Sequence, residues 1–233
     1  MFGGGLWYTF NTDVSVIFSR VYLESEGFMN KSAVFSTELN YIKDENIRNS
    51  AIYLLELLPD YFYTMPASTS GKYHPDFSLG EGGLVRHTKA AVRIAVELFR
   101  DNVFNEFEYG ERTHDLIIMA LLLHDGFKQG FVAGGHTAYD HPLIAAEFVF
   151  QNMTKLPMKQ LDALQVRRMI ASHMGPWNVD KTGTIILPVP KRDDEAFVHL
   201  CDYMASRNFL NINFVDNEIV DTVERGQAKV LKK

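Results

Sequence analysis

Cysteine is nearly missing from this sequence of 233 residues, because Cys201 is its one example. A single thiol excludes an intramolecular disulfide and a metal cluster held by several thiolates. The first residues also lack the basic segment and the long apolar run of a secretory signal. We therefore expect a cytoplasmic protein whose fold depends on core packing.

Long apolar runs are missing as well. The longest extends from Leu116 to Leu123 and is bounded by Asp115 and His124. A helix that crosses a bilayer needs about 20 consecutive apolar residues. We therefore expect no membrane-spanning helix and no membrane partner.

Positive charge is also in short supply. The chain has 23 Lys and Arg residues against 29 Asp and Glu residues, which gives a formal net charge of −6. This balance excludes a protein that binds nucleic acid through surplus positive charge alone. Any phosphate group that it binds must be neutralised by something other than excess Lys and Arg.

Aromatic residues, in contrast, are plentiful: 17 Phe, 10 Tyr and 2 Trp supply enough apolar surface for a folded core. From residue 44 onward, the spacing of apolar residues is helical. It predicts helices over 44–58, 84–98, 113–125, 142–148, 158–173 and 193–209, with Thr113 as N-cap of the third. Residues 59–83 contain too many prolines and glycines for a regular element, and 184–190 look extended.

Residues 1–43 are less regular, and their apolar pattern fits short strands or irregular helix. We assign 1–43 to an N-terminal extension of unknown role and 44–233 to one mainly α domain.

Four of the predicted helices and the start of a fifth direct polar side chains toward the interior. These side chains belong to His87, His124, Asp125, His141, His173 and Asp202. A single buried histidine is usually satisfied by a backbone carbonyl, but six buried polar groups would each need a separate partner. A divalent cation satisfies several of them at once, and a set of imidazoles and carboxylates without thiolates suits Mn, Fe, Co, Ni or Zn.

The same residues resemble the HD superfamily of metal-dependent phosphohydrolases. Their order, His87 followed by His124-Asp125 and then Asp202, resembles the H…HD…D signature of that family. The segment EGGLVRHT around His87 is similar to the GGLxxHT segment of HD domains in bacterial 3′-5′ exoribonucleases and relaxase-associated proteins. The PAS stretch at 66–68 resembles one that those proteins carry there.

Three further motifs follow in the family's order. LLHDGFK at 122–128 resembles LLHDxxK, His141-Pro142 resembles the HPxxGA helix entry, and the Ser-His pair ending at His173 resembles SHHG. The chain departs from the pattern at Met174, where many relatives have a second histidine, and at Phe127, where a loop glycine is common. The resemblance covers 66–207 and implies a mainly α, HD-domain helical bundle.

The resemblance also implies roles for the six polar residues. His87, His124, Asp125 and Asp202 would hold a first metal ion, and Asp125 would bridge to a second ion held by His141 and His173. Two such cations, about 3.5–4 Å apart, activate water at neutral pH and offset charge on a phosphoryl group. The implied cofactor is thus two divalent ions per chain.

Four residues are candidates for contact with substrate. Lys128, one turn past the catalytic Asp125, can stabilise charge on a phosphate oxygen or lie solvated in a loop. Arg207 can contact phosphate or form a surface ion pair, and Trp177 can stack on a base or cap the core. His136 is either a substrate contact or the alternative ligand of the second metal, whereas His74 and His199 are weaker candidates.

The sequence therefore predicts a phosphohydrolase that acts on a nucleotide or nucleic-acid phosphate ester, with phosphodiesters favoured over monophosphates. The lack of a basic groove favours a small nucleotide or short nucleic acid over long RNA. Two alternatives remain open: an HD-fold di-iron oxygenase, and a non-catalytic module that senses a nucleotide. A homo-oligomer is compatible with all three.

Overall fold

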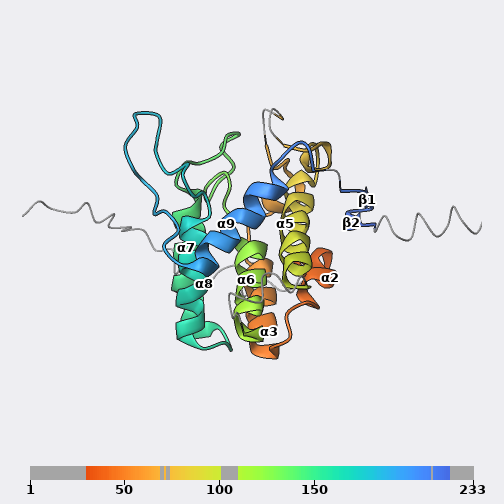
Figure 1. Ribbon diagram of the computed structural model, residues 1–233, viewed down its shortest axis with the longest axis vertical. Helices are drawn as coiled ribbons and strands as arrows, with labels where there is room; N and C mark the ends of the chain where they lie inside the picture. Colours follow the sequence, from red (N-terminus) through yellow and green to blue (C-terminus); the bar gives the residue numbers. More distant parts are fainter. Residues whose placement is uncertain (1–29, 69–70, 72–73, 101–109, 211, 221–233) are drawn as a thin grey trace, which may run out of the picture. The chain divides into compact units, whose positions relative to one another are not determined.

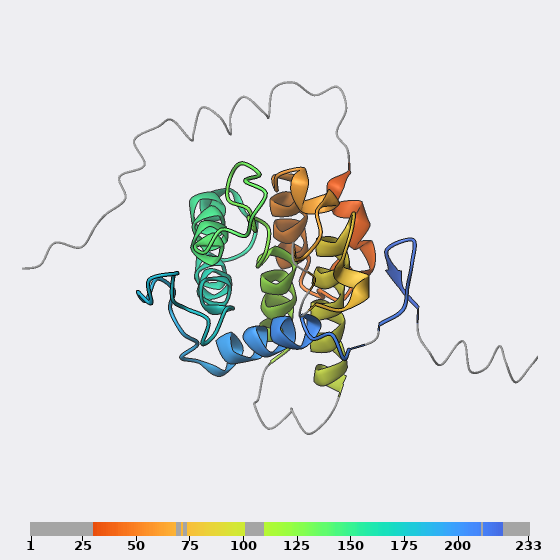
Figure 2. The same ribbon diagram turned by 90° about the horizontal axis from the view of Figure 1, so that it is seen from above.

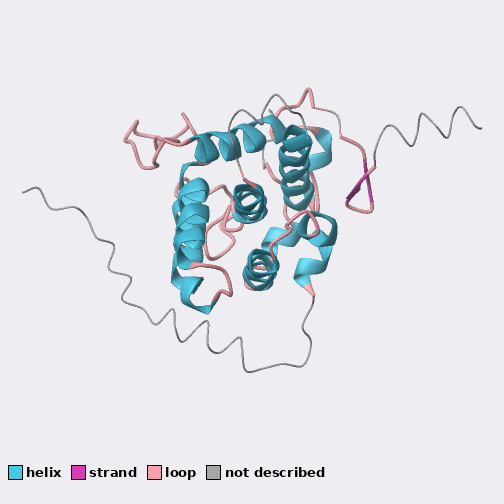
Figure 3. Ribbon diagram, turned by 60° about the horizontal axis from the view of Figure 1, so that its bottom comes forward, coloured by secondary structure: helices cyan, strands magenta, loops and turns pink. Residues whose placement is uncertain are grey.

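The computed structural model describes residues 30–68, 71, 74–100, 110–210 and 212–220 (Figure 1). In this part of the chain the protein is mainly helical, as the sequence predicts, and one short hairpin follows the last helix (Figure 3). No helix among these residues is long and apolar enough to pass through a bilayer.

Six longer helices make up most of this fold. They are α3 (Glu45–Glu56), α5 (Gly83–Arg100), α6 (Glu111–Leu123), α7 (His141–Asn152), α8 (Gln160–Ser172) and α9 (Asp193–Ala205). Shorter elements connect or flank them: η1 (Lys31–Phe35), α2 (Ser36–Leu39), α4 (Tyr61–Thr64), η2 (Asp76–Ser78), η4 (Met153–Lys155), and the antiparallel strands β1 (Phe214–Val215) and β2 (Glu218–Ile219).

Helix α6 lies at the centre of the bundle. Every residue from Asp115 to Leu123 is buried, which is why this helix is apolar nearly all round. Helices α3, α5, α8 and α9 all contact it, and α7 packs against α8. Figure 2 shows α9, in blue, running across α5, α6 and α8. The end of α6 is therefore surrounded by elements that come from distant parts of the sequence.

The helix ends follow local hydrogen bonding. Asp44 caps α3 as an acceptor, since its Oδ1 lies 2.9 Å from the amide of Asn46 and 3.1 Å from that of Ile47. Pro142 lies in the first turn of α7, as predicted. Thr113 is not the N-cap of α6, because the helix begins two residues earlier, at Glu111.

The first turn of α6 can start early because ion pairs with residues outside the helix stabilise it. The guanidinium of Arg112 binds Asp44 at 2.7 Å and also pairs with Asp162. At the other end of the fold, α9 stops at Ala205 instead of Phe209. Ser206 Oγ lies 2.7 Å from the carbonyl oxygen of Tyr203, so the side chain competes for a helix carbonyl.

The segment 59–83 is more regular than its prolines and glycines predict. It contains α4 and η2, and α4 buries Phe62 completely against Phe35 of η1, with 6.0 Å between the ring centroids. Residues 184–190 form no named strand, although Ile185 makes an isolated bridge with Val179.

Residues 31–43 of the predicted extension lie in the same compact unit as the helices. Phe35 and Ile42 are fully buried, and Glu56 accepts hydrogen bonds from the amides of Lys31 and Ser32. The rest of the predicted extension, 1–29, lies outside the described residues.

Candidate metal centre

All six predicted ligands come together at one end of α6, from five different helices. They form two groups that share Asp125, and the potential ligand atoms within each group lie within 4.8 Å of one another. The first group consists of His87, His124, Asp125 and Asp202, and the second of Asp125, His141 and His173.

Each ligand sits at or near the end of an element, which brings the side chains to a common point. His124 and Asp125 directly follow α6, and His141 is the first residue of α7. His173 is the C-cap of α8. All four are buried, at 0–1% exposure.

Backbone carbonyl groups orient three of the four imidazoles. In each case Nδ1 lies 2.7 Å from the carbonyl oxygen of the residue three positions earlier. A neutral ring that donates from Nδ1 carries its lone pair on Nε2, so Nε2 is the atom presented to the centre. The three pairs are His124 with Leu121, His141 with Ala138, and His173 with Ile170.

Asp125 lies between two pairs of histidines, and each of its carboxylate oxygens faces one pair. Oδ1 is 3.0 Å from Nε2 of His141 and 3.6 Å from Nε2 of His173. Oδ2 is 3.4 Å from Nε2 of His124 and 3.7 Å from Nε2 of His87. This is the arrangement that a carboxylate needs to bridge two cations.

Asp202 completes the first group from α9. Its Oδ1 lies 3.0 Å from Nε2 of His87 and 3.4 Å from Nε2 of His124. Burial disfavours its charged form, but the neighbouring imidazoles of His124 and His87 outweigh burial and hold the pKa of Asp202 well below its usual range. The carboxylate is therefore charged and available as a ligand at neutral pH.

The pKa values of three other residues in this cluster are shifted by burial and by neighbouring charges. Burial opposes charge on His124, yet the carboxylates of Asp125 and Asp202 raise its pKa to about 10, and a metal ion at Nε2 would take the place of that proton. Burial also opposes charge on Asp125, but Lys128 and His124 hold the pKa of this carboxyl well below its usual range. Burial lowers the pKa of His141.

The donor set fits a metal ion on two independent grounds. His124 Nε2 and Asp125 Oδ1 are buried and have no hydrogen bond of acceptable geometry, which is costly unless another partner satisfies them. Ligands about 2.1 Å from an ion lie about 3.0–3.4 Å apart at octahedral or tetrahedral angles. The distances of 3.0–3.7 Å between facing atoms come close to that spacing.

Of the predicted substrate contacts, Lys128 lies nearest to the ligands. Its Nζ is 2.5 Å from Asp125 Oδ2, and its side chain is only 12% exposed. His136 instead lies in an exposed part of the loop before α7 and belongs to neither ligand group.

Trp177 and Arg207 both contact the ring of Tyr203. Trp177 stacks on the ring of Tyr203, and the Arg207 guanidinium carbon lies 4.3 Å from the centre of the same ring. Arg207 Nη2 also donates to Ser206 Oγ at 2.8 Å. Neither residue belongs to a ligand group.

The structure places two further residues near this centre: His74, a weaker candidate from the sequence, and Tyr61, which the sequence did not indicate. The ring of His74 lies 6.0 Å from that of His87, and burial lowers the pKa of His74 to about 4. The hydroxyl of Tyr61 donates to the carbonyl of Gly130 and accepts from the amide of Gln129 at 3.3 Å. Tyr61 thus fixes the turn that follows Lys128, and no sequence pattern links these distant positions.

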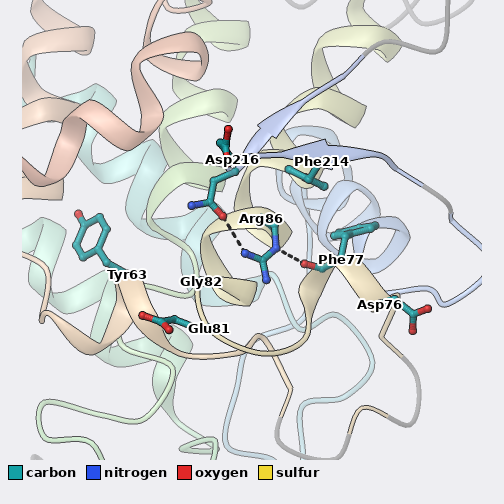
Figure 4. A pocket seen from close by; sticks show the side chains of 9 residues that line it. Tyr63, Asp76, Phe77, Glu81, Gly82, Arg86, Phe214 and Asp216 are labelled. Atoms are coloured by element: carbon teal, nitrogen blue, oxygen red, sulfur yellow. Dashed lines mark hydrogen bonds between the residues drawn. The ribbon is translucent and has the colours of Figure 1, made fainter. Parts of the chain in front are cut away.

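A surface hollow of about 730 Å³ lies beside the start of α5, between η2 and the hairpin (Figure 4). Arg86 spans it, donating to the Asn217 side chain at 2.8 Å and to the backbone carbonyl of Phe77. Its lining includes neither ligand group. The hollow is therefore the attachment site of the hairpin and is separate from the candidate metal centre.

Comparisons with known proteins do not identify the chain. No family model and no solved structure matches it. A stretch of 53 residues is 38% identical to the transcriptional regulator MraZ of Marinomonas sp. (strain MWYL1), covering 23% of this chain and 35% of that protein. Because the chain spans only about a third of this relative, the match does not show a shared family.

Proposed function

We propose that this protein is an HD-type, metal-dependent phosphohydrolase that hydrolyses a phosphate ester of a nucleotide or short nucleic acid. The observation that carries the proposal is the position of Asp125, whose two oxygens face two different pairs of histidines. A histidine core stabilised only by hydrogen bonds has no need for this shared carboxylate.

The proposal includes two divalent ions per chain, one for each ligand group. His87, His124, Asp125 and Asp202 would hold one ion, and Asp125, His141 and His173 the other. Without thiolates, the set suits Mn, Fe, Co, Ni or Zn. Bound there, the ions supply Lewis-acid charge for the phosphoryl group and lower the pKa of water.

The chain's own residues position the reaction. Backbone carbonyls hold the imidazoles of His124, His141 and His173 in one orientation, so these three rings are already oriented toward the centre. Lys128 can turn its ammonium group from Asp125 to a non-bridging phosphate oxygen and stabilise negative charge there. The buried residues of α6 exclude water from beneath the ligands.

Two features favour a small phosphodiester as substrate. The second ligand group would hold a second cation, whereas mononuclear HD nucleotidases manage without such a group. The formal net charge of −6 leaves no surplus positive charge to hold a long polynucleotide.

Metal content provides the first test. We expect two metal ions per chain by elemental mass spectrometry, falling toward one in His141→Ala, because that substitution removes a ligand of the second group only. His136→Ala is the matched control and should keep two ions, since His136 lies outside both groups. One ion per chain, unchanged in His141→Ala, would contradict the binuclear site.

Activity provides the second test. Protein loaded with Mn should release phosphate or shortened products from mononucleotides, cyclic dinucleotides or short oligonucleotides, and Asp125→Ala should abolish this release. Absence of any product would refute the hydrolase. Consumption of O₂ by the iron-loaded protein would instead assign an oxygenase.

A regulatory role is the second candidate. The partial match to a protein named as a transcriptional regulator favours it, and here the metal centre would stabilise a module that senses a nucleotide. Tight nucleotide binding without product over several hours would support this role over hydrolysis.

A further inference from the structure

Three aromatic rings gather on α9 and on the loop that follows α8. The indole of Trp177 lies nearly parallel to the ring of Tyr203, with 14° between the planes and 5.4 Å between the centroids. The ring of His199 lies 5.9 Å from Trp177 and 6.1 Å from Tyr203. With the guanidinium of Arg207 over Tyr203, these residues form what we term the aromatic platform.

Trp177 is the exposed member of the aromatic platform. It is 51% exposed, although an indole that merely capped the core would be largely covered. Because Trp177 is exposed and stacks in parallel on Tyr203, its indole offers a flat apolar face to solvent. Nucleobases stack on such faces whatever their sequence, because every base has a π-face.

The aromatic platform is tied to the candidate metal centre at two points. Tyr203 directly follows the ligand Asp202, so their side chains leave α9 about 100° apart. His199 Nδ1 lies 2.7 Å from the carbonyl oxygen of the ligand His173. Trp177 comes four residues after His173, so their Cα atoms are at most about 14 Å apart.

Gly175 fixes the geometry of this connection. Its φ is +59°, a backbone conformation that favours glycine, and a Cβ there would lie 2.4 Å from the His199 ring. The backbone therefore passes directly over His199 on its way from His173 to Trp177. The platform is held in place by packing before any ligand binds.

We infer that the aromatic platform binds the base of a nucleotide whose phosphate reaches the candidate metal centre, an inference that rests on the proposed function. Trp177 stacks on the base, and Tyr203 and His199 support the indole from behind and from the side. Arg207 adds positive charge to a substrate that is negative. Because stacking does not read base edges, purines and pyrimidines should both bind.

Tryptophan fluorescence tests this inference directly. The chain contains two tryptophans, Trp7 and Trp177, so full-length Trp7→Phe protein with its metals bound reports on Trp177 alone. We expect AMP to quench this fluorescence saturably, and ribose 5-phosphate, which has the phosphate but no base, to leave it unchanged. Equal effects of both compounds, or no saturable quenching by AMP, would overturn the inference.

Calorimetric titration with AMP supplies the second readout. Base stacking contributes about 1–3 kcal/mol, so Trp177→Ala should weaken AMP binding by about 5- to 150-fold and leave metal content unchanged. Tyr203→Phe, which keeps the supporting ring, should bind normally, whereas Tyr203→Ala should bind more weakly. Unchanged affinity in Trp177→Ala would also overturn the inference.

Phe150→Ala is the matched control for these variants. Phe150 also carries an arginine over its ring, since the Arg167 guanidinium lies 4.7 Å away, but it lies near the opposite end of α7 from His141. It should bind AMP like the parent protein. Base-dependent binding without hydrolysis would support base binding by the aromatic platform and contradict the proposed hydrolase. Hydrolysis that Trp177→Ala does not change would support the hydrolase and contradict base binding by the platform.

Discussion

Lys128 forms an ion pair with Asp125 and, by our proposal, contacts a phosphate oxygen when metal ions and substrate are bound. Its ammonium group lies 2.5 Å from Asp125 Oδ2, the oxygen that faces His87 and His124. Cations that shared that carboxylate, as proposed above, would repel the ammonium group of Lys128 from it and free that group to contact a phosphate oxygen. A mostly buried lysine beside a bridging carboxylate is thus suited to hold a phosphate oxygen.

The charge of Lys128 can be removed with little change of shape. We expect Lys128→Met to keep both metal ions and to lower kcat/KM by about 100-fold, the usual effect of losing one group that stabilises transition-state charge. Steady-state kinetics with Mn, together with metal analysis, measures both quantities. Lys43→Met serves as the control, because Lys43 forms an exposed pair with Glu111. Loss of metal with unchanged turnover per ion would contradict this role.

At the residue scale, the sequence predicts which polar side chains come together but not what surrounds them. Helical spacing directs His87, His173 and Asp202 inward, and Pro142 places His141 at the start of a helix. Tyr61 could not be predicted in the same way, because its bond to the turn after Lys128 joins a segment without periodicity to a distant loop. Such contacts depend on tertiary packing, which local spacing does not encode.

At the scale of elements, the middles of the helices are predicted and several ends are not. The apolar stripe of α6 is plain in the sequence, yet the helix begins at Glu111, where Arg112 is held by Asp44 of another element. Helix α5 begins at Gly83 for a comparable reason, since a Cβ there would lie 2.2 Å from the carbonyl oxygen of Ser78. Contacts between elements therefore decide where these helices start.

Gly83→Ala tests whether the start of α5 positions the ligand His87 one turn later. The methyl group would collide with backbone atoms, so α5 must shift, and we expect a loss of about 2–4 kcal/mol in the free energy of unfolding. Urea denaturation measures that loss, and metal titration should show weaker binding. Gly134→Ala is the control, because its Cβ would meet nothing closer than 4.0 Å. Equal stability of the two variants would show that α5 accommodates the shift freely.

At the scale of the whole molecule, the hairpin is joined to the bundle by a buried charge. Lys89 is fully buried on α5, two residues after His87, and its Nζ lies 3.2 Å from Glu38 of α2 and 2.8 Å from Glu218 of β2. One lysine thus connects the first α-helix and the last strand of the described fold. Lys89 and Glu38 are both buried, and two such charges are costly to bury unless they neutralise one another.

This cluster predicts a pH dependence of stability. Burial raises the pKa of Glu38 above its ordinary 4.5, and the attraction of Lys89 offsets only part of that effect. An acid whose pKa is raised in the folded state binds its proton more tightly there, so its contribution to stability is present below pH 4.5 and is lost as pH rises through the raised value. Glu38→Gln removes this loss, because an amide does not ionise.

Urea unfolding of Glu38→Gln and the parent protein from pH 4.5 to 7 measures the effect. Relative to the parent, the variant should become more stable as pH rises through this window, by about 1.4 kcal/mol for each unit by which folding raises the pKa. Glu97→Gln, on an exposed part of α5 beside Arg93, is the matched control and should run parallel to the parent. A parallel curve for Glu38→Gln as well would mean that Lys89 fully compensates the burial of Glu38, and that the hairpin is attached without an electrostatic cost.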